Sequence, residues 1–397
     1  MEEELKFLLD MNKKLEQDEF FVDNNSNIDL STEYPYLVFM RDDLIRAINL
    51  CGRLIQTKSN ISAYNSISFM PLTWEKKMWL YATNELSYFR FGVELMGDSN
   101  EMLGEDFSIP LLTLQKLLKL MGTKVLIYKR DSNFYIRLLG GDLLLDTRPI
   151  SPQIIKFPAE PTNKIADLTL QDFGSIVCSM LPLLNSEIKG DLKKIQFTGN
   201  KAYFNSSYYY IESDISTPRL SLSYRDAEFI SSLYKYYKDK QIQLFQTTGD
   251  LPRIYLSLDN INYLFINSTS SIVDLISQQM EKVLNNTEVV TLYDMFNKIT
   301  NLATSLPGST GNITLKYVDG ILYMTIISNK GNSEFSFTTD KIGKERLYSK
   351  EVTLRAETLR KLLSSFNNSE VIGLALGDFG ITLEDKGIKA VLMSFSN

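Results

Sequence analysis

The chain contains no histidine among its 397 residues. Without an imidazole, Ser-His-Asp and Cys-His catalysis and histidine-ligated metal sites are excluded. The only cysteines, Cys51 and Cys178, lie in apolar helical patterns and are too far apart in sequence for a zinc knuckle or a disulfide framework, so we expect two buried thiols. No apolar run approaches the roughly 20 residues that span a bilayer, and the acidic start MEEEL lacks the features of a signal peptide. We expect a cytoplasmic protein that does not use the common hydrolase mechanisms.

Internal repeats are the most informative feature that is present. Residues 113–118 read TLQKLL and residues 358–363 read TLRKLL, and both are followed by a helix end and several short strands. A weaker third copy begins at Glu228, roughly midway between them. Copies spaced by about 120 residues predict three homologous domains.

A second repeated unit is offset from the first. RDDLIRAINL, LQDFGSIVCS and LYDMFNKITN place Asp43, Asp172 and Asp294 in the first turn of three apolar helices, where an acidic side chain is expected to act as a cap. Each domain therefore consists of two similar halves, each a helix followed by a strand cluster. The clusters alternate apolar and polar residues and turn at Gly199-Asn200 and Asp319-Gly320, as antiparallel hairpins do. The predicted fold class is α+β, with six helices packed on antiparallel sheets.

This organisation resembles the bacterial DNA polymerase sliding clamp, the beta subunit family. The resemblance covers about residues 32–397 and rests on domain number, element order and repeat position, supported by segments such as VTLRAETLRKLL and the closing strand KAVLMSFSN. It implies an N-terminal extension at 1–31 and clamp domains at 32–157, 158–287 and 288–397. It also implies a ring formed by a head-to-tail homodimer, with no catalytic residues, cofactor or metal. Sequence divergence and the Asn/Ile/Lys-rich composition favour a phage-encoded member.

A ring that slides on duplex DNA needs positive charge facing the phosphates without base-specific contacts. Six helix windows, at 42–58, 110–124, 171–187, 225–240, 291–304 and 355–365, together carry +5, whereas the whole chain carries −6. A basic inner surface on an acidic body has this asymmetry, although solvated helix faces would also explain it. The expected DNA-facing residues are Arg46, Arg53, Lys116, Lys119, Arg225, Lys235, Lys238, Lys298, Arg360 and Lys361.

The resemblance further implies a hydrophobic groove between the second and third domains that binds short linear peptides of a DNA polymerase and a clamp loader. Its walls here would be Tyr208, Tyr209, Tyr210, Val391, Leu392, Met393, Ser394 and Phe395, with Leu275 and Val283 as weaker members. The sequence departs from the family at Ser394, where proline is usual, and at the tyrosines, which replace a Gly-containing turn. A purely structural role in the core is the alternative for Val391 and Leu392.

Other signals have simpler interpretations. QIQLF at 241–245 resembles clamp-binding peptides but follows a helix, so we interpret it as a core strand. The tyrosines at 208–210 and in YKYY at 234–237 could stack on bases, but alternating strand aromatics and a partly exposed helix face explain them more simply. The extension 1–31 has the spacing of a short amphipathic helix. An acidic cluster that could hold Mg²⁺ is more simply a set of solvated loop carboxylates: Asp98, Glu101, Glu105 and Asp106.

Two other function classes stay open at this point. A β-rich phage structural or assembly protein would also lack catalytic residues and carry repeats. A carboxylate-and-metal nuclease would need clustered Asp and Glu at strand ends, which the sequence does not offer.

Overall fold

The computed structural model describes most of the chain from Tyr34 to Ser394. The expected helix within 1–31 lies outside the described residues. The described ranges are 34–55, 61–72, 75–84, 86–96, 105–138, 141–148, 163–184, 194–206, 208–247, 252–267, 289–318, 320–338, 340–341, 351–367, 369–377 and 380–394.

One arrangement of elements occurs six times along the described chain: a strand, a helix and then three strands. We call each copy a repeat unit. The first comprises β1 (Tyr36–Met40), α2 (Arg41–Cys51), β2 (Ser66–Leu72), β3 (Lys77–Thr83) and β4 (Tyr88–Glu94), with the short α3 (Ser62–Asn65) before β2. The second comprises β5 (Phe107–Pro110), α4 (Leu111–Leu117) with the 3₁₀ turn η2 (Leu118–Leu120), β6 (Lys124–Arg130), β7 (Asn133–Leu138) and β8 (Gly141–Leu144).

The middle of the chain holds the third and fourth repeat units. The third is β9 (Asn163–Thr169), α5 (Leu170–Leu184), β10 (Ile195–Phe197), β11 (Lys201–Asn205) and β12 (Tyr209–Asp214). The fourth is β13 (Leu220–Leu222), α6 (Tyr224–Tyr237), β14 (Gln241–Gln246), β15 (Arg253–Leu258) and β16 (Ile261–Ile266).

The last two repeat units complete the chain. The fifth is β17 (Val289–Leu292), α8 (Tyr293–Ser305), β18 (Ser309–Val318), β19 (Ile321–Ser328) and β20 (Ser333–Thr338), followed by the two-residue strand β21 (Asp340–Lys341). The sixth is β22 (Glu351–Arg355), α9 (Ala356–Leu363) with η3 (Ser364–Phe366), β23 (Val371–Gly377), β24 (Gly380–Asp385) and β25 (Ile388–Met393). The six helices coincide with the predicted windows to within a few residues at most ends.

Successive repeat units exchange their first strands. β1 pairs antiparallel with β6 of the second unit, while β5 of the second unit pairs with β2 of the first. The same exchange places β13 beside β10, β17 beside β23 and β22 beside β18. Each pair of repeat units is therefore one interlocked domain, which agrees with the prediction of three domains, each built from two similar halves.

Two large sheets join strands from different pairs of repeat units. An eight-stranded sheet runs β5-β2-β3-β4-β16-β15-β14-β9, in which β4 pairs with β16 from Phe91↔Ile261 to Tyr88↔Leu264. A nine-stranded sheet runs β13-β10-β11-β12-β25-β24-β23-β17-β21, in which β12 pairs with β25. The two remaining sheets have four strands each, in the orders β1-β6-β7-β8 and β20-β19-β18-β22.

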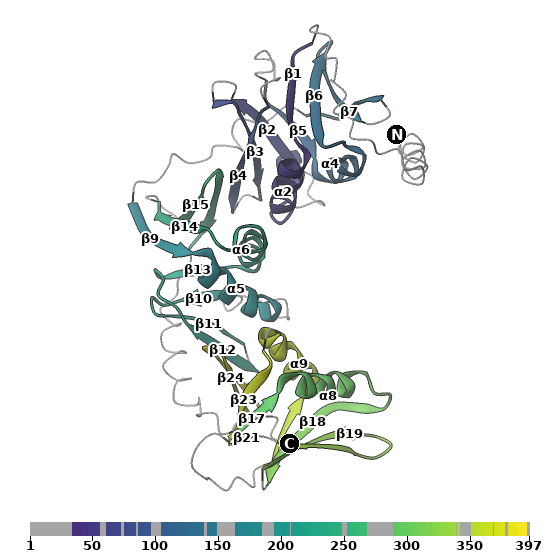
Figure 1. The fold of residues 1–397 in the computed structure, drawn as a ribbon, viewed down its shortest axis with the longest axis vertical. Helices are drawn as coiled ribbons and strands as arrows, with labels where there is room; N and C mark the ends of the chain where they lie inside the picture. The colour runs from purple at the N-terminus through teal and green to yellow at the C-terminus, as the bar shows by residue number, and fades with distance from the viewer. Residues whose placement is uncertain are drawn as a thin grey trace. The chain divides into compact units, whose positions relative to one another are not determined.

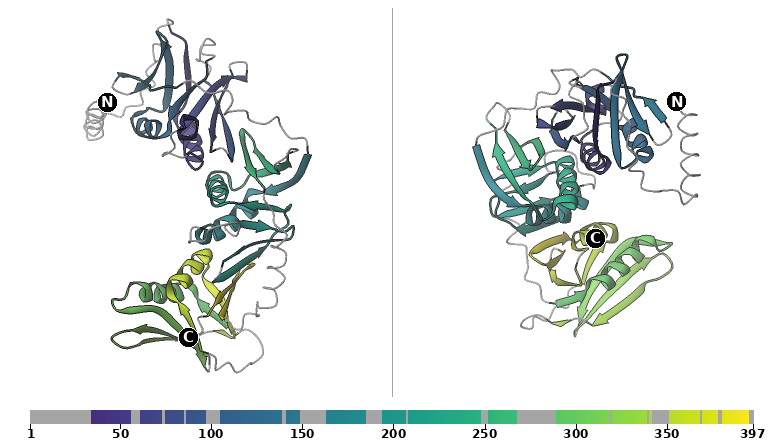
Figure 2. Two further views of the ribbon diagram at one scale, coloured as in Figure 1. Left: turned by 180° about the vertical axis from the view of Figure 1, so that it is seen from behind. Right: turned by 45° about the horizontal axis from the view of Figure 1, so that its top comes forward.

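The chain packs as two compact units, Met1–Lys164 with Gln243–Ile266 and Ile165–Ile242 with Asn267–Asn397. Most of β14 to β16 belongs to the first unit because β16 continues the sheet of β4. The predicted boundaries 32–157, 158–287 and 288–397 stay predictions. Within the second unit α5 lies beside α6 and α8 beside α9, as Figures 1 and 2 show.

The helices bury one apolar face each, as their 3.6-residue periodicity requires. In α8 this face includes Phe296 and Ile299, and α8 packs on β18 (Figure 1). In α5 it includes Gly174, and an added Cβ there would lie 2.8 Å from Tyr234 of α6, so this glycine permits close helix packing. No helix in the described part of the chain is long and apolar enough to span a bilayer.

The expected acidic caps are partly wrong. Asp43, Asp172 and Asp294 all lie in the first turn of their helices. The N-cap positions of α2 and α8, however, are occupied by Met40 and Leu292, whose side chains make no capping hydrogen bond. At α5 the hydroxyl of Thr169 accepts a hydrogen bond from the backbone N–H of Asp172 (3.2 Å) and donates to its carboxylate (2.6 Å). The acids therefore favour the positive helix ends as charges, while a preceding hydroxyl is the capping group where one exists.

Candidate functional site

The ten cations predicted to face DNA all lie on helices or on the turns that directly follow them. Eight of them are exposed, opposite the buried helix faces. The other two are half-buried and ion-paired: Arg46 with Asp43 one turn before it, and Lys361 with Glu357 at 3.2 Å. These two pairs reduce the positive charge that the helices present.

The charge asymmetry is also smaller than the sequence windows predicted. Over the observed helices, with η2 included, the net charge is +2, because these helices are shorter than the windows and leave out cations such as Arg53, Lys124, Lys238 and Arg355. The helix surfaces remain more positive than the rest of the chain, which is the sign that phosphate contact requires.

The residues predicted to form the peptide pocket meet in one strand pair of the second unit. Tyr209 lies opposite Leu392 and Tyr210 opposite Val391, where β12 joins β25. All four are almost fully buried. These four buried side chains form the floor of this region. Their burial agrees with the alternative stated above for Val391 and Leu392, a purely structural role in the core.

Hydrogen bonds fix the buried tyrosines. The Tyr209 hydroxyl donates to the carbonyl of Leu183 at 3.1 Å, which ties β12 to the end of α5. The Tyr210 hydroxyl donates to Oε2 of Glu212 at 2.8 Å, and Lys201 donates to Oε1 of the same carboxylate at 3.1 Å. This carboxylate is buried and fully paired, as a buried charge must be to be tolerated.

The surface above this strand pair is formed by Tyr208, which is 44% exposed, and by the half-buried Met393 and Ser394. The backbone N–H of Met393 donates to the carbonyl of Tyr208 at 2.9 Å, so the two residues are held together. The guanidinium carbon of Arg355 lies 5.8 Å from the centre of the Tyr208 ring. The remaining members of the prediction, Leu275, Val283 and Phe395, lie outside the described residues.

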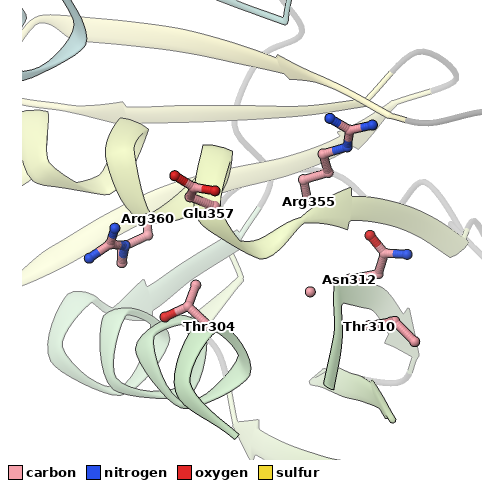
Figure 3. A pocket seen from close by; sticks show the side chains of 7 residues that line it. Thr304, Thr310, Asn312, Arg355, Glu357 and Arg360 are labelled. Atoms are coloured by element: carbon pink, nitrogen blue, oxygen red, sulfur yellow. The ribbon is translucent and has the colours of Figure 1, made fainter. Parts of the chain in front are cut away.

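Beside Arg355 the surface is hollowed, with a volume of about 480 Å³. Figure 3 shows this polar hollow: Arg355, Glu357 and Arg360 come from the end of β22 and from α9, and the opposite wall comes from the end of α8 and the start of β18. Its lining residues are Thr304, Thr310, Gly311, Asn312, Arg355, Glu357 and Arg360.

Sequence reasoning overlooked Arg355 and the polar hollow. One signal was available: in the repeat TLQKLL/TLRKLL, Arg355 corresponds to Pro110 of the first copy, so a charged residue replaces an apolar one where the helix begins. The hollow itself depends on residues from four elements whose proximity only the folded chain shows.

The other sequence candidates have clear places. Ile242 and Leu244 of QIQLF are buried in β14, as the core-strand interpretation predicted. Glu105 accepts from Lys129 at 2.5 Å, and burial raises the pKa of Asp106. Asp98 and Glu101 lie outside the described residues. Within the described residues, no group of three His, Cys, Asp or Glu side chains is placed to hold a metal ion.

Solved structures with a closely similar fold are bacterial sliding clamps. The sliding clamp (DNA polymerase III subunit beta) of Bartonella birtlesii, bound to griselimycin, superposes with a TM-score of 0.75 at 11% identity over 92% of this chain and 100% of its own. DNA polymerase III subunit beta of Pseudomonas aeruginosa gives 0.73 at 12% identity over 91% and 100%. The beta subunit of Thermotoga maritima gives 0.71 at 12% over 91% and 99%.

Neither protein-family models nor curated protein sequences match the chain. At these identities the likeness establishes the fold: the chain has the sliding-clamp fold of three repeated α+β domains. It covers nearly the whole of each neighbour, and it does not favour the alternative of a structural or assembly protein.

Proposed function

We propose that this protein is a DNA sliding clamp, a processivity factor that encircles duplex DNA without reading its sequence. The observation that carries the proposal is the sixfold repeat unit arranged in the sliding-clamp fold over 91% of the chain. The topological nature of this activity needs no catalytic residues, cofactor or metal. The chain then acts as a homodimer that tethers a polymerase and is placed on DNA by a clamp loader.

Sheet topology supports the head-to-tail dimer. The last strands of four repeat units pair across domains, β4 with β16 and β12 with β25, whereas β8 and β20 each end a four-stranded sheet. An unpaired last strand is an edge available for pairing with another chain. Pairing β8 of one copy with β20 of the next extends the same rule and, applied twice, closes a ring of six domains. Leu144 on β8, which is 54% exposed, would be covered by this contact.

The ring is tested with native mass measurement and negative-stain imaging of the full chain. We expect a dimer with a central hole at micromolar concentration and physiological salt, and a shift to monomer for Leu144→Asp. Leu86→Asp is the matched control, because Leu86 is also exposed but lies off β8. A wild-type protein that is only monomeric under these conditions would contradict the dimer.

DNA contact is proposed for the ten helix cations named above. Sliding requires a flat energy profile, so each contact should be weak and replaceable. We expect neutralising Lys116, Lys235 and Lys298 together to reduce retention on circular DNA, while each single change has little effect. Lys330→Ala, in an exposed turn outside the helices, is the control. Loss of binding by one substitution in a sequence-dependent way would contradict the clamp.

Partner binding is proposed for the surface above the β12–β25 strand pair. Tyr208, Met393 and Ser394 are its accessible members, with Tyr209, Tyr210, Val391 and Leu392 as the buried floor and Phe395, Leu275 and Val283 as further walls. Deleting residues 393–397 should abolish binding of a polymerase or loader peptide while the ring stays intact. Unchanged peptide binding would refute the assignment.

A further inference from the structure

The polar hollow beside Arg355 is not explained by ring closure or by the floor of the peptide surface. We propose that it binds an acidic side chain of the partner peptide whose apolar residues occupy the surface at Tyr208 and Met393, and that Arg355 selects such peptides. The inference rests on the proposed function and adds the chemistry of the partner. A volume of about 480 Å³ lies within the range of about 300–1,000 Å³ usual for small-ligand sites.

Arg355 connects the two sites. Its guanidinium carbon lies 5.8 Å from the centre of the Tyr208 ring, which places it at the edge of the peptide surface. Arg355 also lines the polar hollow, where it lies directly across from Asn312 in the β18–β22 pair. Directly opposed residues have Cβ atoms about 5 Å apart, so the amide and the guanidinium can contact the same group. A peptide that leaves the Tyr208 surface on this side meets Arg355 first.

The charge of the lining favours an anion. Among the lining residues that the structure describes, the one carboxylate, that of Glu357, is ion-paired with Lys361 at 3.2 Å. Arg355 and Arg360 therefore determine the net charge, and Figure 3 shows them on either side of Glu357. A guanidinium presents two parallel N–H groups to a carboxylate, which gives the pair directional preference as well as attraction.

A peptide carboxylate fits this position better than a DNA phosphate. Arg355 ends β22 and is the N-cap residue of α9, and its guanidinium lies over the ring of Tyr208 in the peptide surface, where a bound peptide would pass. The threonines of the opposite wall already donate their hydroxyl protons to carbonyls, Thr304 to Asn301 and Thr310 to Ile327, so binding of an anion would depend on the arginines. Phosphate contact is kept as an outcome of the test.

The experiment compares two labelled peptides by fluorescence anisotropy with the full chain. One is EEQIQLFEE and the other is its uncharged counterpart QQQIQLFQQ, both built on the clamp-binding-like pentapeptide QIQLF. We expect the acidic peptide to bind about fivefold more tightly at low salt, as expected for an exposed ion pair of about 1 kcal/mol. The preference should disappear in Arg355→Gln, with binding of QQQIQLFQQ retained. Lys316→Gln, which removes an exposed cation further along β18, should keep it.

The outcomes separate the inference from the proposed function. Equal binding of the two peptides by the wild type overturns the acidic preference and leaves the peptide surface in place. Failure of both peptides to bind overturns both. If Arg355→Gln instead weakens retention on circular DNA and keeps the peptide preference, the hollow serves phosphate and the inference is wrong. Unchanged thermal melting of each variant shows that the exposed substitutions leave the fold intact.

Discussion

Among the glycines that the structure describes, Gly380 is the one at which an added methyl group should do most damage. It begins β24 with φ +150° and lies opposite Met393 in the β24–β25 pair. An ideal Cβ at this position would lie 1.9 Å from the carbonyl oxygen of Leu392 and 2.8 Å from its carbonyl carbon. Both are backbone atoms, so no side chain can rotate away, and β25 itself must shift in Gly380→Ala.

The expected cost has two parts. A non-glycine residue in this region of φ costs about 1–3 kcal/mol, and forcing extra volume into a packed site costs a further amount of about 1–3 kcal/mol. Gly331 separates the two, because it has φ +123° and no atom within 4 Å of its ideal Cβ. We expect Gly380→Ala to lower the free energy of unfolding by about 3–5 kcal/mol and Gly331→Ala by about 1–2 kcal/mol.

Thermal melting followed by circular dichroism measures the difference. At about 2–4 °C per kcal/mol for a domain of 150–250 residues, the two variants should differ by at least several degrees. Since β25 carries Met393, Gly380→Ala should also weaken peptide binding when the protein is still folded. Equal melting temperatures for the two variants would refute the reasoning, because the strain in φ is common to both and only the overlap differs.

Three further predictions follow from close packing, burial and charge. Gly174→Ala should lower the melting temperature by several degrees, since the new Cβ would lie 2.8 Å from Cδ2 and 2.9 Å from Cγ of Tyr234. A double variant with Tyr234→Ala removes these two ring atoms and should recover part of the loss. Burial raises the pKa of both cysteine thiols. At pH 8 a disulfide reagent should therefore modify the half-buried Cys178 slowly and Cys51 only after unfolding. Rapid modification of Cys51 in the folded protein would contradict its burial. The Arg137 guanidinium holds the pKa of the Asp142 carboxyl below its usual 3.8. The ionised carboxylate therefore stabilises the β7–β8 edge above about pH 4, and this contribution is lost as pH falls through the lowered pKa. Asp142→Asn should remove that part of the acid dependence of dimer formation.

The helices and hairpins could be predicted because their signals are local. A 3.6-residue apolar period identified the helix of each of the six described repeat units, although not the short α3, and Gly199 and Gly320 occupy the left-handed turn positions that the hairpin interpretation required. Capping was less predictable: the acidic residues are in the first turn, but Leu292 and Met40 cap their helices without a side-chain hydrogen bond. In these two helices strand pairing, rather than a cap, sets where the helix begins, because each follows directly on a strand.

The candidate sites show where sequence reasoning is limited. It brought β12 and the last strand together correctly, yet it gave Tyr208, Tyr209 and Tyr210 a common role. Consecutive residues on a strand point to opposite faces, but here Tyr209 and Tyr210 are both buried. Tyr209 reaches the end of α5, where its hydroxyl donates to Leu183, and Tyr210 packs on the ring of Tyr203 and donates to Glu212. Of the three tyrosines, Tyr208, just before the strand, remains accessible. What covers each face of a strand depends on the folded chain and cannot be derived from three identical letters.

Exchange of first strands between repeat units bears on how the proposed ring would close. A unit that kept its own first strand would be a self-contained four-stranded layer, and two such layers could separate. By giving β1 to the second unit and taking β5 in return, the first unit is interlocked with its neighbour. Among the described strands, those that pair between domains are last strands, and four of the six do so within one chain. The other two, β8 and β20, lie in the second and fifth repeat units and end their sheets, so the proposed dimer would pair each with the edge that a second copy presents. The same local rule that builds each domain therefore favours a closed dimer over an open chain of subunits whenever the sheet curvature brings the edges together.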